Sequence, residues 1–326
     1  MKILVTGGAG FVGGYLIASL RQEFGDDVEI CLTAKSGEIS PSDIPVGPLD
    51  VTDEPAVTAA IRRLAPTHIV HLAGLAAVPA ASANANVAWQ VHLFGTLNLA
   101  NAILRHAPDC SLVFVGSGQV YGSTARSGQP LTEQALLAPT NEYALTKAAA
   151  DLAVGCLAER GLRCVRLRPF NHTGPGQSEQ FVIPSFAMQI ARIEAKRQPP
   201  VIHVGNLEAE RDFLDVRDVT TAYARVVARS ADLAAGVIFN IASGVPRRIG
   251  DVLDRLVKIS GSKIAIEQDT SRLRAVDTPR FVGDSERARR TLDWKPHYEF
   301  DETLRQILTS ARIKVSNMVS NSSTGG

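Results

Sequence analysis

The stretch TGGAGFVG, Thr6–Gly13, decides the fold. It comes directly after the apolar run Lys2–Thr6, which predicts a strand, and it opens the helical pattern of Gly10–Phe24. A glycine-rich turn between a first strand and a first helix is typical of the loop that holds a dinucleotide. Glycine-rich turns are common, so the prediction depends on this strand–turn–helix setting.

The glycines of this loop have separate predicted tasks. Gly7 permits the tight turn, Gly10 lets the backbone approach a pyrophosphate, and Gly13 lets the helix pack closely on the sheet. The first turn of the helix adds Phe11 and Val12. Backbone amides and the positive end of the helix dipole then face the phosphates. We expect these residues to bind the cofactor.

Short β-branched runs alternate with longer helical patterns along the chain, which is typical of βαβ units and a parallel sheet. We predict strands at Lys2–Thr6, Val28–Thr33, Val46–Asp50, His68–Leu72, Ser111–Gly116 and Arg163–Arg168. We predict helices at Gly10–Phe24, Glu54–Leu64, Val87–Arg105 and Glu142–Arg160. The predicted fold is α/β, a Rossmann-like doubly wound parallel sheet with a smaller α/β substrate-binding lobe.

This rhythm changes after Pro169, where a Gly/Pro-rich loop and short mixed segments begin. Val216–Ala228 and Val237–Ile241 have the pattern of a further helix and strand, which favours a return to the first domain. We predict a cofactor-binding domain over 1–168 and 212–245, a substrate-binding lobe over 169–211 and 246–315, and a disordered polar tail over 316–326.

The composition of the 326 residues excludes several classes of protein. A formal net charge of +1 gives no overall field that favours nucleic acid or an anionic membrane, and no apolar run approaches membrane-spanning length. The N-terminus leaves no room for a signal peptide. Four cysteines without ligand-like spacing indicate thiols in a reducing compartment. We expect a cytoplasmic protein without a metal site that binds neither nucleic acid nor membrane.

The end of the second strand bears on the choice of cofactor. NAD-binding folds usually place an acid about 20 residues after the glycines, where it reaches the ribose hydroxyls. Here the strand leads to Lys35 and carries no such acid. A lysine favours a 2′-phosphate, although it could be simply a solvated loop residue; the prediction is NADP(H), with NAD(H) left open. Asp50 and Val51 are candidates for an adenine contact or for capping the next helix.

A proton-handling group is predicted at Ser117, Tyr143 and Lys147. Tyr143 and Lys147 are four residues apart on a predicted helix, so they are neighbours on one face. An ammonium beside a phenol lowers the pKa of the phenol, which makes it a usable acid or base near neutrality. Ser117 ends a buried strand at the edge where α/β sheets bind ligands. A tyrosine–lysine pair alone is often coincidence, but downstream of a dinucleotide loop it predicts catalysis.

Taken together, these motifs resemble the extended short-chain dehydrogenase/reductases, a family of nucleotide-sugar epimerases, dehydratases and reductases. The resemblance covers nearly the whole chain. It depends on the glycine loop, HLAG at His71–Gly74, the serine before VYG at Val120–Gly122, and the Tyr-x-x-x-Lys pair. It implies that Leu72, Ala73 and Gly74 line the cofactor site.

Two later motifs, RPFNHTGPGQ at Arg168–Gln177 and GNLEAERDFLDVRD at Gly205–Asp218, resemble the branch that processes GDP-mannose derivatives. Guanidinium groups fork onto phosphate oxygens, so arginines in this lobe are candidate clamps for a sugar-nucleotide diphosphate. The resemblance implies a GDP-linked keto-deoxy sugar held by Asn171, Phe181, Val182, Arg211, Arg274 and Asp277.

Gly118 and Gln119 stand where the resembling dehydratases carry a glutamate, often with an adjacent aspartate. Neither residue can transfer a proton at neutral pH, so dehydration is disfavoured. The missing ribose acid argues mildly against a 4-epimerase, which needs tightly held NAD. The resemblance then implies reduction of GDP-4-keto-6-deoxy-D-mannose to GDP-D-rhamnose, with Tyr143 protonating the C4 oxygen, Ser117 holding it and Gln119 orienting the sugar. A 4-epimerase is the alternative, and a non-catalytic cofactor-sensing protein ranks third.

The chain departs from the family pattern at His92, Glu142 and Thr146, where the family usually has asparagine, proline and serine. The asparagine often supports a proton path, so the replacement at His92 puts that relay in doubt. The alanine- and leucine-rich helices Val87–Arg105 and Glu142–Arg160 carry more apolar surface than one face needs. The resemblance implies that they pair with a second subunit in a four-helix bundle, giving a homodimer.

Overall fold

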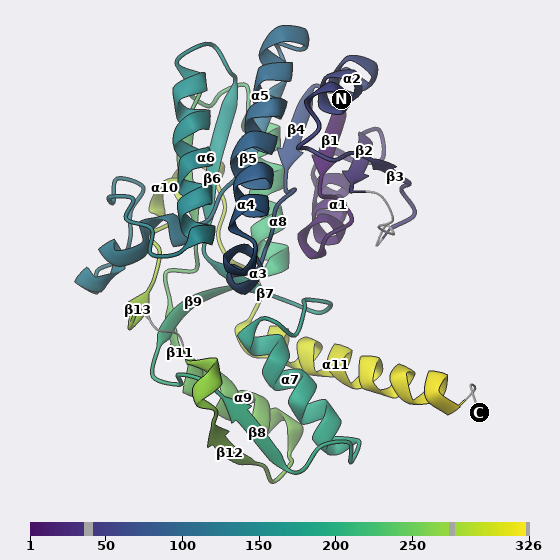
Figure 1. The fold of residues 1–326 in the computed structure, drawn as a ribbon, viewed down its shortest axis with the longest axis vertical. Coiled ribbons are helices and arrows are strands. Elements are labelled where there is room, and N and C mark those ends of the chain that lie inside the picture. Colours follow the sequence, from purple (N-terminus) through teal and green to yellow (C-terminus); the bar gives the residue numbers. More distant parts are fainter. Residues whose placement is uncertain (36–41, 274–277, 324–326) are drawn as a thin grey trace.

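A seven-stranded parallel sheet forms the larger part of the molecule (Figure 1). The computed structural model describes residues 1–35, 42–273 and 278–323. The sheet order is β10-β6-β5-β4-β1-β2-β3, with every neighbouring pair parallel. Its strands are β1 (Lys2–Thr6), β2 (Glu29–Ala34), β3 (Val46–Pro48), β4 (His68–His71), β5 (Ser111–Val115), β6 (Cys164–Pro169) and β10 (Val237–Ile241). The predicted Rossmann-like α/β fold is confirmed.

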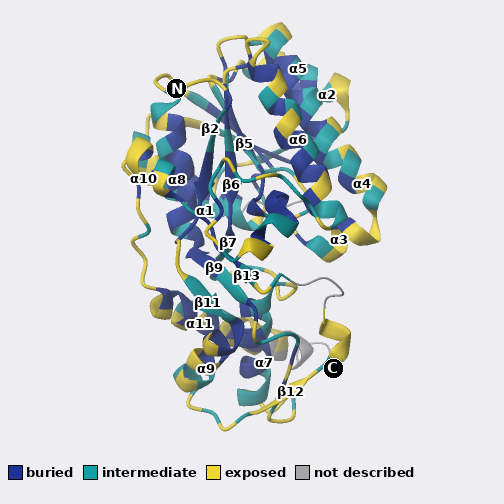
Figure 2. Cartoon of the chain, turned by 90° about the vertical axis from the view of Figure 1, so that its left-hand side faces the viewer, coloured by how far each residue is buried: buried dark blue, intermediate teal, exposed yellow. Residues whose placement is uncertain are grey.

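Helices cover both faces of this sheet, and each face has its own buried core (Figure 2). One core contains residues of α1 (Phe11–Phe24), α8 (Val216–Arg229) and α10 (Glu286–Leu292). The other contains residues of α2 (Glu54–Leu64), α5 (Gly95–His106) and α6 (Glu142–Ala158). The short α3 (Val78–Ala83) and α4 (Ala85–Trp89), the π-helical turn η1 (Gln90–Phe94) and the 3-10 segment η2 (Gly118–Ser127) lie near the ends of α5 and α6.

The remaining elements form a smaller second lobe (Figure 1). In one small sheet β9 (Glu210–Asp215) pairs with β7 (Asn171–Thr173), β11 (Pro246–Arg248) and β13 (Arg280–Phe281). In another, β8 (Val201–Val204) pairs with β12 (Ala265–Gln268). The helices α7 (Val182–Glu194), α9 (Ile249–Ser260) and α11 (Phe300–Ser323) share the core of this lobe, and η3 is Thr270–Arg272.

The prediction of a single α-helix over Val87–Arg105 is wrong in the middle of this range. The structure has α4, the π-helical turn η1 and then α5 from Gly95. A Cβ at Gly95 would lie 2.7 Å from the side chain of Val51, so only glycine lets α5 approach so closely. The π-helical turn places His92 in the interior, where it is 1% exposed.

The predicted division of the chain differs from the structure in three places. β9 pairs within the second lobe, so the return to the large sheet begins with α8 at Val216 and not at residue 212. Helix α10 packs on the large domain through Ala288 and Leu292, although 246–315 was assigned to the lobe. Helix α11 continues through Ser323, so most of the tail predicted to be disordered from 316 is helical. Val315, on the buried face of α11, lies directly before this region.

Among the described residues, no helix combines the length and the apolar character needed to cross a membrane. Within the same ranges, no cluster of three or more His, Cys, Asp or Glu side chains could hold a metal ion.

Candidate active site

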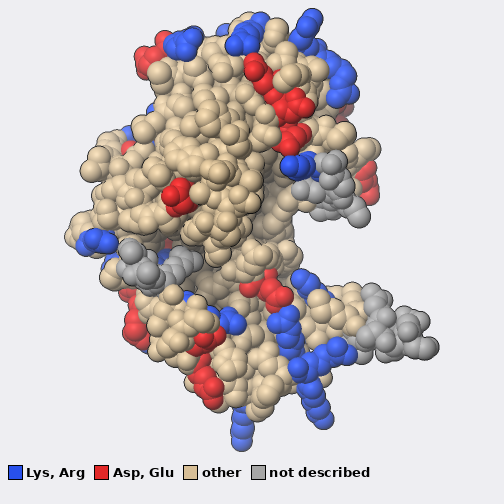
Figure 3. Space-filling model, viewed as in Figure 1, with Lys and Arg blue, Asp and Glu red and all other residues tan. Residues whose placement is uncertain are grey.

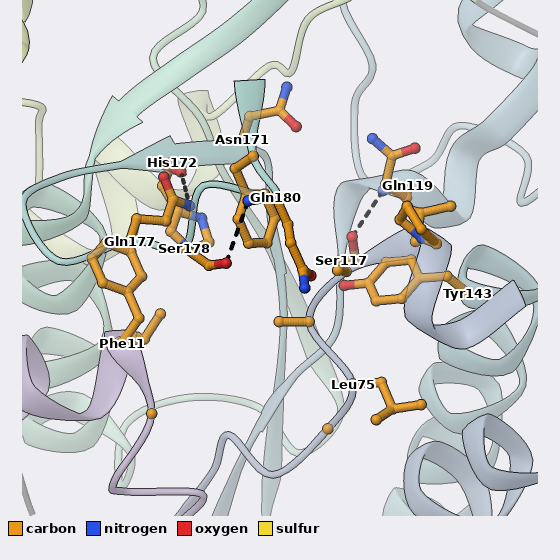
Figure 4. Close-up of a pocket in the computed structure, with 18 of the residues that line it drawn as sticks. Phe11, Leu75, Ser117, Gln119, Tyr143, Asn171, His172, Gln177, Ser178 and Gln180 are labelled. Atoms are coloured by element: carbon orange, nitrogen blue, oxygen red, sulfur yellow. Dashed lines mark hydrogen bonds between the residues drawn. The ribbon is translucent and has the colours of Figure 1, made fainter. Parts of the chain in front are cut away.

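A cavity of about 1300 Å³ lies between the large domain and the second lobe, where the molecule is visibly hollowed (Figures 3 and 4). Its walls are the glycine loop, the carboxyl ends of β4, β5 and β6, and the segment from β7 into α7. This is the edge at which open parallel sheets bind ligands. Apart from Gly13, every site residue predicted from the sequence and described by the structure lines this cavity.

The glycine loop has the geometry of a phosphate cradle. Gly7 has a φ of +69°, and a Cβ there would lie 2.7 Å from the backbone nitrogen of Ala73. Gly13 faces the loop itself, where a Cβ would overlap the carbonyl oxygen of Gly8, so its task is close packing. Gly10 caps α1 without a side-chain hydrogen bond. The first amides of α1 therefore face the cavity without a side-chain acceptor, as an anion site requires.

The predicted cofactor-selecting residues lie together at one end of the cavity. Lys35 Nζ is 3.0 Å from Asp50 Oδ2, and the lysine side chain is 75% exposed. Asp50 also accepts from the backbone nitrogen and hydroxyl of Thr52, and these bonds together with Lys35 lower the pKa of its carboxyl. Asp53, not Asp50, caps α2. Of the two readings left open for Asp50, the cap is therefore wrong, and both Asp50 and Val51 face the cavity.

Ser117 and Tyr143 approach each other from different elements (Figure 4). Ser117 ends the loop after β5, and its hydroxyl accepts from the backbone nitrogen of Gln119 at 3.2 Å. Asn141 caps α6 by accepting from the backbone nitrogen of Ala144, which fixes Tyr143 in the first turn. Burial raises the pKa of Tyr143, and a hydrogen bond with Ser117 opposes this rise. The phenol of Tyr143 therefore carries its proton near neutral pH.

Lys147 lies one turn further along α6 and is 8% exposed. Its Nζ donates to the carbonyl oxygen of Val115 at 3.1 Å, and burial lowers its pKa to about 8. The expected lowering of the Tyr143 pKa by this ammonium is not found, because burial has the largest effect on this pKa and raises it. The ammonium of Lys147 extends instead to the end of β5, where it bonds Val115.

The second lobe contributes the opposite wall. Asn171, Phe181, Val182 and Arg211 line the cavity, and Gln119 does so from the large domain. Arg211 Nη1 donates to the carbonyl oxygens of Glu210 and Thr278, at 2.8 and 2.7 Å. Phe181 is extended and caps α7, which begins at Val182. The predicted Arg274 and Asp277 lie outside the described residues.

Among the polar residues of this cavity that sequence reasoning missed are Thr173, Gln177 and Tyr223. Like the side-chain nitrogen of Asn171, their side-chain oxygens are buried and have no hydrogen-bond partner among the described residues. Buried polar groups are normally paired, so unpaired ones in a cavity wall point to a ligand. Thr173 and Gln177 fall within the quoted RPFNHTGPGQ motif, which could have indicated them. Tyr223 could not be distinguished from a core residue of an amphipathic helix.

Two contacts join the glycine-loop helix to the wall contributed by the second lobe. The rings of Phe11 and His172 are stacked, with centroids 6.4 Å apart and an interplanar angle of 2°. Tyr15 donates its hydroxyl to the carbonyl oxygen of Pro175 at 2.8 Å. The two sides of the cavity therefore meet directly beside the phosphate cradle.

Comparisons with known proteins agree with this geometry. The family described as GDP-mannose 4,6 dehydratase matches residues 4–307. The GDP-6-deoxy-D-mannose reductase of Pseudomonas aeruginosa is 36% identical over 251 residues, which cover 77% of this chain and 82% of that protein.

Solved structures of two enzymes are similar over nearly the whole chain. The structure of RMD from Pseudomonas aeruginosa complexed with NADPH has a TM-score of 0.81 at 31% identity and covers 96% of this chain and 99% of its own. The UDP-glucose 4-epimerase of Thermus thermophilus in complex with NAD has a TM-score of 0.82 at 26% identity, with coverage of 96% and 99%. Reductase and epimerase relatives thus share this fold.

Proposed function

This chain belongs to the GDP-mannose 4,6 dehydratase family of extended short-chain dehydrogenase/reductases, and we propose that it reduces GDP-4-keto-6-deoxy-D-mannose to GDP-D-rhamnose. One observation carries the proposal. Ser117, Tyr143 and Lys147 line the same cavity, with Ser117 hydrogen-bonded to Tyr143, while the positions that need a proton-transferring acid for dehydration hold Gly118 and Gln119. The 36% identity to a GDP-6-deoxy-D-mannose reductase supports the choice of substrate.

The proposed catalytic roles follow from where the side chains lie. The bound nicotinamide cofactor supplies the hydride that reduces the C4 carbonyl carbon. Tyr143, kept protonated by burial, donates its proton to the C4 oxygen, and the Ser117 hydroxyl holds that oxygen. Lys147 holds the cofactor ribose at the end of β5, and Gln119 orients the sugar from the same wall of the cavity.

The cofactor of the proposal is NADP(H). The cradle at Gly7 and Gly10 fits a pyrophosphate, because Gly10 leaves the first amides of α1 without a side-chain acceptor and a Cβ at Gly7 would meet the backbone of Ala73. The exposed Lys35 offers a positive charge to a 2′-phosphate. A similar reductase structure contains NADPH, whereas the similar epimerase contains NAD, so NAD(H) stays the second choice. Leu72, Ala73 and Gly74 complete the cofactor wall.

On the substrate side, we assign the GDP-sugar to the wall formed by the second lobe. The unpaired side-chain nitrogen of Asn171 faces the diphosphate and sugar, and Arg211 neutralises the diphosphate. Phe181 and Val182 flank the base. Arg274 and Asp277 are proposed as a further diphosphate clamp and a contact to the substrate ribose.

The proposal also includes a homodimer, assembled through a four-helix bundle of α5 and α6 with their partner copies. Four apolar side chains on or beside these helices are 40–60% exposed, namely Val87, Phe94, Leu145 and Leu152. Covering them with an identical surface would remove apolar area from water. We place the enzyme in the cytoplasm, since its four cysteines are free thiols.

The decisive experiment incubates the protein with NADPH and GDP-4-keto-6-deoxy-D-mannose and identifies the product by NMR. The proposal requires one NADPH oxidised per sugar reduced, with NADH tested in parallel. Interconversion of nucleotide sugars without net cofactor oxidation would instead establish the 4-epimerase alternative, which the similar epimerase structure favours. Absence of cofactor oxidation with every 4-keto-hexose nucleotide would overturn the reductase assignment.

A further inference from the structure

A chain of buried hydrogen bonds joins the start of the glycine loop to the helix that carries Tyr143. It runs from the end of β1 through the end of β4, helix α5 and the π-helical turn η1 to α6. Each side chain in it is at most 2% exposed. Its members are Thr6, His71, Thr96, His92 and Thr146.

The hydrogen bonds from Thr6 to Thr96 determine which ring nitrogen of His71 carries the proton. The Thr96 hydroxyl donates its single proton to the carbonyl oxygen of His92 at 2.6 Å, so it can only accept from His71 Nε2, at 3.1 Å. The other ring nitrogen, Nδ1, then accepts from the Thr6 hydroxyl at 2.7 Å. His71 is therefore a neutral ring with its proton on Nε2.

In His92 the hydrogen bonds place the proton on Nδ1, whereas in His71 they place it on Nε2. The single proton of the Thr146 hydroxyl is shared between the carbonyl oxygens of Glu142 and Tyr143, at 2.9 and 3.0 Å, so the hydroxyl accepts from His92 Nδ1 at 2.8 Å. Nε2 is left to accept from the backbone nitrogen of Leu75 at 3.0 Å.

A doubly protonated ring at His92 is disfavoured. Only a charged ring could donate to both the Thr146 hydroxyl and the Leu75 carbonyl oxygen, which lies 3.2 Å from Nε2. Burial, together with the nearby charge of Lys147, lowers the pKa of His92 to about 3. The ring is thus neutral at physiological pH.

We infer that His92 is a positioning residue that locks the cavity wall at Leu75 onto the Tyr143 helix, and that it does not carry the proton of the reaction. Both ring nitrogens of His92 are already hydrogen-bonded, Nε2 to Leu75 and Nδ1 to Thr146. The ring contacts that of Tyr143 edge-on, with centroids 5.6 Å apart. Together with His71 it sets the distance between the phosphate cradle and the catalytic tyrosine. The kinetic part of this inference rests on the proposed reductase function; the assignment of the protons does not.

The proton assignment is tested by ¹⁵N-edited NMR of the histidine rings in the full chain between pH 5 and 9. Of the seven histidines, His71 should give the signals of an Nε2–H ring and His92 those of an Nδ1–H ring, neither changing with pH. His92→Gln identifies the second set by its loss. Titration of either ring in this range, or the opposite proton position, would overturn the inference.

The positioning role is tested by turnover of matched variants. His92→Gln retains an amide donor and an acceptor but cannot carry a proton, so most of the turnover should remain. His92→Ala should lose about 10- to 100-fold, as expected when a reacting group is misplaced. If His92→Gln is as slow as His92→Ala while its thermal stability equals that of the wild type, the residue is a proton carrier and the inference fails.

Substitutions at Thr146 test the positioning role of His92 independently. Thr146→Val removes the hydroxyl and should slow turnover, whereas Thr146→Ser keeps it and should lose less. In the His92→Ala background, Thr146→Val should cost little more, because the two side chains share one hydrogen bond. Additive losses would contradict this coupling.

The control is His68→Gln, at the opposite end of β4, where the ring bonds Thr67 and Ser230 and should not affect turnover. If the wild-type protein oxidises no NADPH, the proposed reductase function is wrong. The proton positions on His71 and His92 are then still tested by the NMR experiment.

Discussion

Lys147 reaches from α6 to the end of β5, where its ammonium donates to the carbonyl oxygen of Val115 over 3.1 Å. Burial lowers the pKa of this lysine from 10.5 to about 8 in the folded protein. Between these values the unfolded state binds more protons, so this group adds stability as the pH rises from 8 to 10.5. At neutral pH the buried charge of Lys147 therefore lowers the free energy of unfolding.

Replacing this lysine should stabilise the protein while abolishing its activity. We expect Lys147→Met to raise the free energy of unfolding at pH 7 by about 1–3 kcal/mol, with the gain shrinking towards pH 10. Urea denaturation at both pH values measures the difference. A variant that is less stable than wild type at pH 7, by an amount independent of pH, would show that the buried charge carries no such cost.

Removing the phenolic proton should separate chemistry from binding. Tyr143→Phe should reduce turnover at least about 100-fold, because no group is left to protonate the C4 oxygen, while NADPH binding is retained. Single-turnover kinetics and a fluorescence titration with NADPH measure the two quantities. Turnover close to that of the wild type would exclude Tyr143 as the proton donor.

Acid should destabilise the fold through its two buried histidines. The pKa values of His71 and His92 are lowered from 6.5 to about 3, chiefly by burial. Between these values the unfolded chain binds more protons, so stability is lost as the pH falls below about 6.5. Unfolding free energies measured from pH 7 to pH 4 should fall, and in His92→Gln the slope should be smaller by about one proton.

Loss of the hydroxyl should affect stability to different extents in two fully buried tyrosines. Tyr121 donates to Asn240 at 2.7 Å and accepts from Arg168 at 3.0 Å, so Tyr121→Phe should cost about 1–3 kcal/mol. The hydroxyl of Tyr223 has no hydrogen-bond partner among the described residues. Tyr223→Phe should therefore change the unfolding free energy by less than about 1 kcal/mol. Equal losses in thermal denaturation would indicate that Tyr223 is paired.

The proposed dimer predicts a selective effect of surface charge. Leu152 on α6 is 60% exposed, and Leu152→Glu should halve the mass measured by light scattering. Ile313 on α11 is 57% exposed but lies on the second lobe, so Ile313→Glu should leave the mass unchanged. A monomeric wild type, or an unaffected dimer in Leu152→Glu, would exclude this interface.

Much of the large domain can be predicted from the sequence because its signals are local. Glu54–Leu64 was predicted with the observed bounds, since Asp53 provides a cap and the apolar residues recur at helical spacing. Val237–Ile241 was likewise predicted with its observed bounds. The cavity lining followed because the carboxyl ends of parallel strands meet at one edge.

The second lobe could not be predicted in the same way. β9 has the same residue pattern whichever sheet it joins, and β7, β11 and β13 are two or three residues long, too short for a period to be recognised. The π-helical turn that buries His92 and the unpaired hydroxyl of Tyr223 depend on tertiary packing. The pKa of Tyr143 also depended on burial, which outweighs the local lysine.

The way β10 returns to the large sheet limits how this protein can be divided. β10 pairs with β6 at the edge of the sheet, and α8 and α10 cover the same core, yet all three follow β7 in the chain. A fragment ending at Pro169 would expose the backbone of β6 and the apolar side chains of Val165 and Leu167. The cofactor-binding half is therefore not a transferable module, and exchange of substrate lobes between relatives would need several simultaneous crossovers.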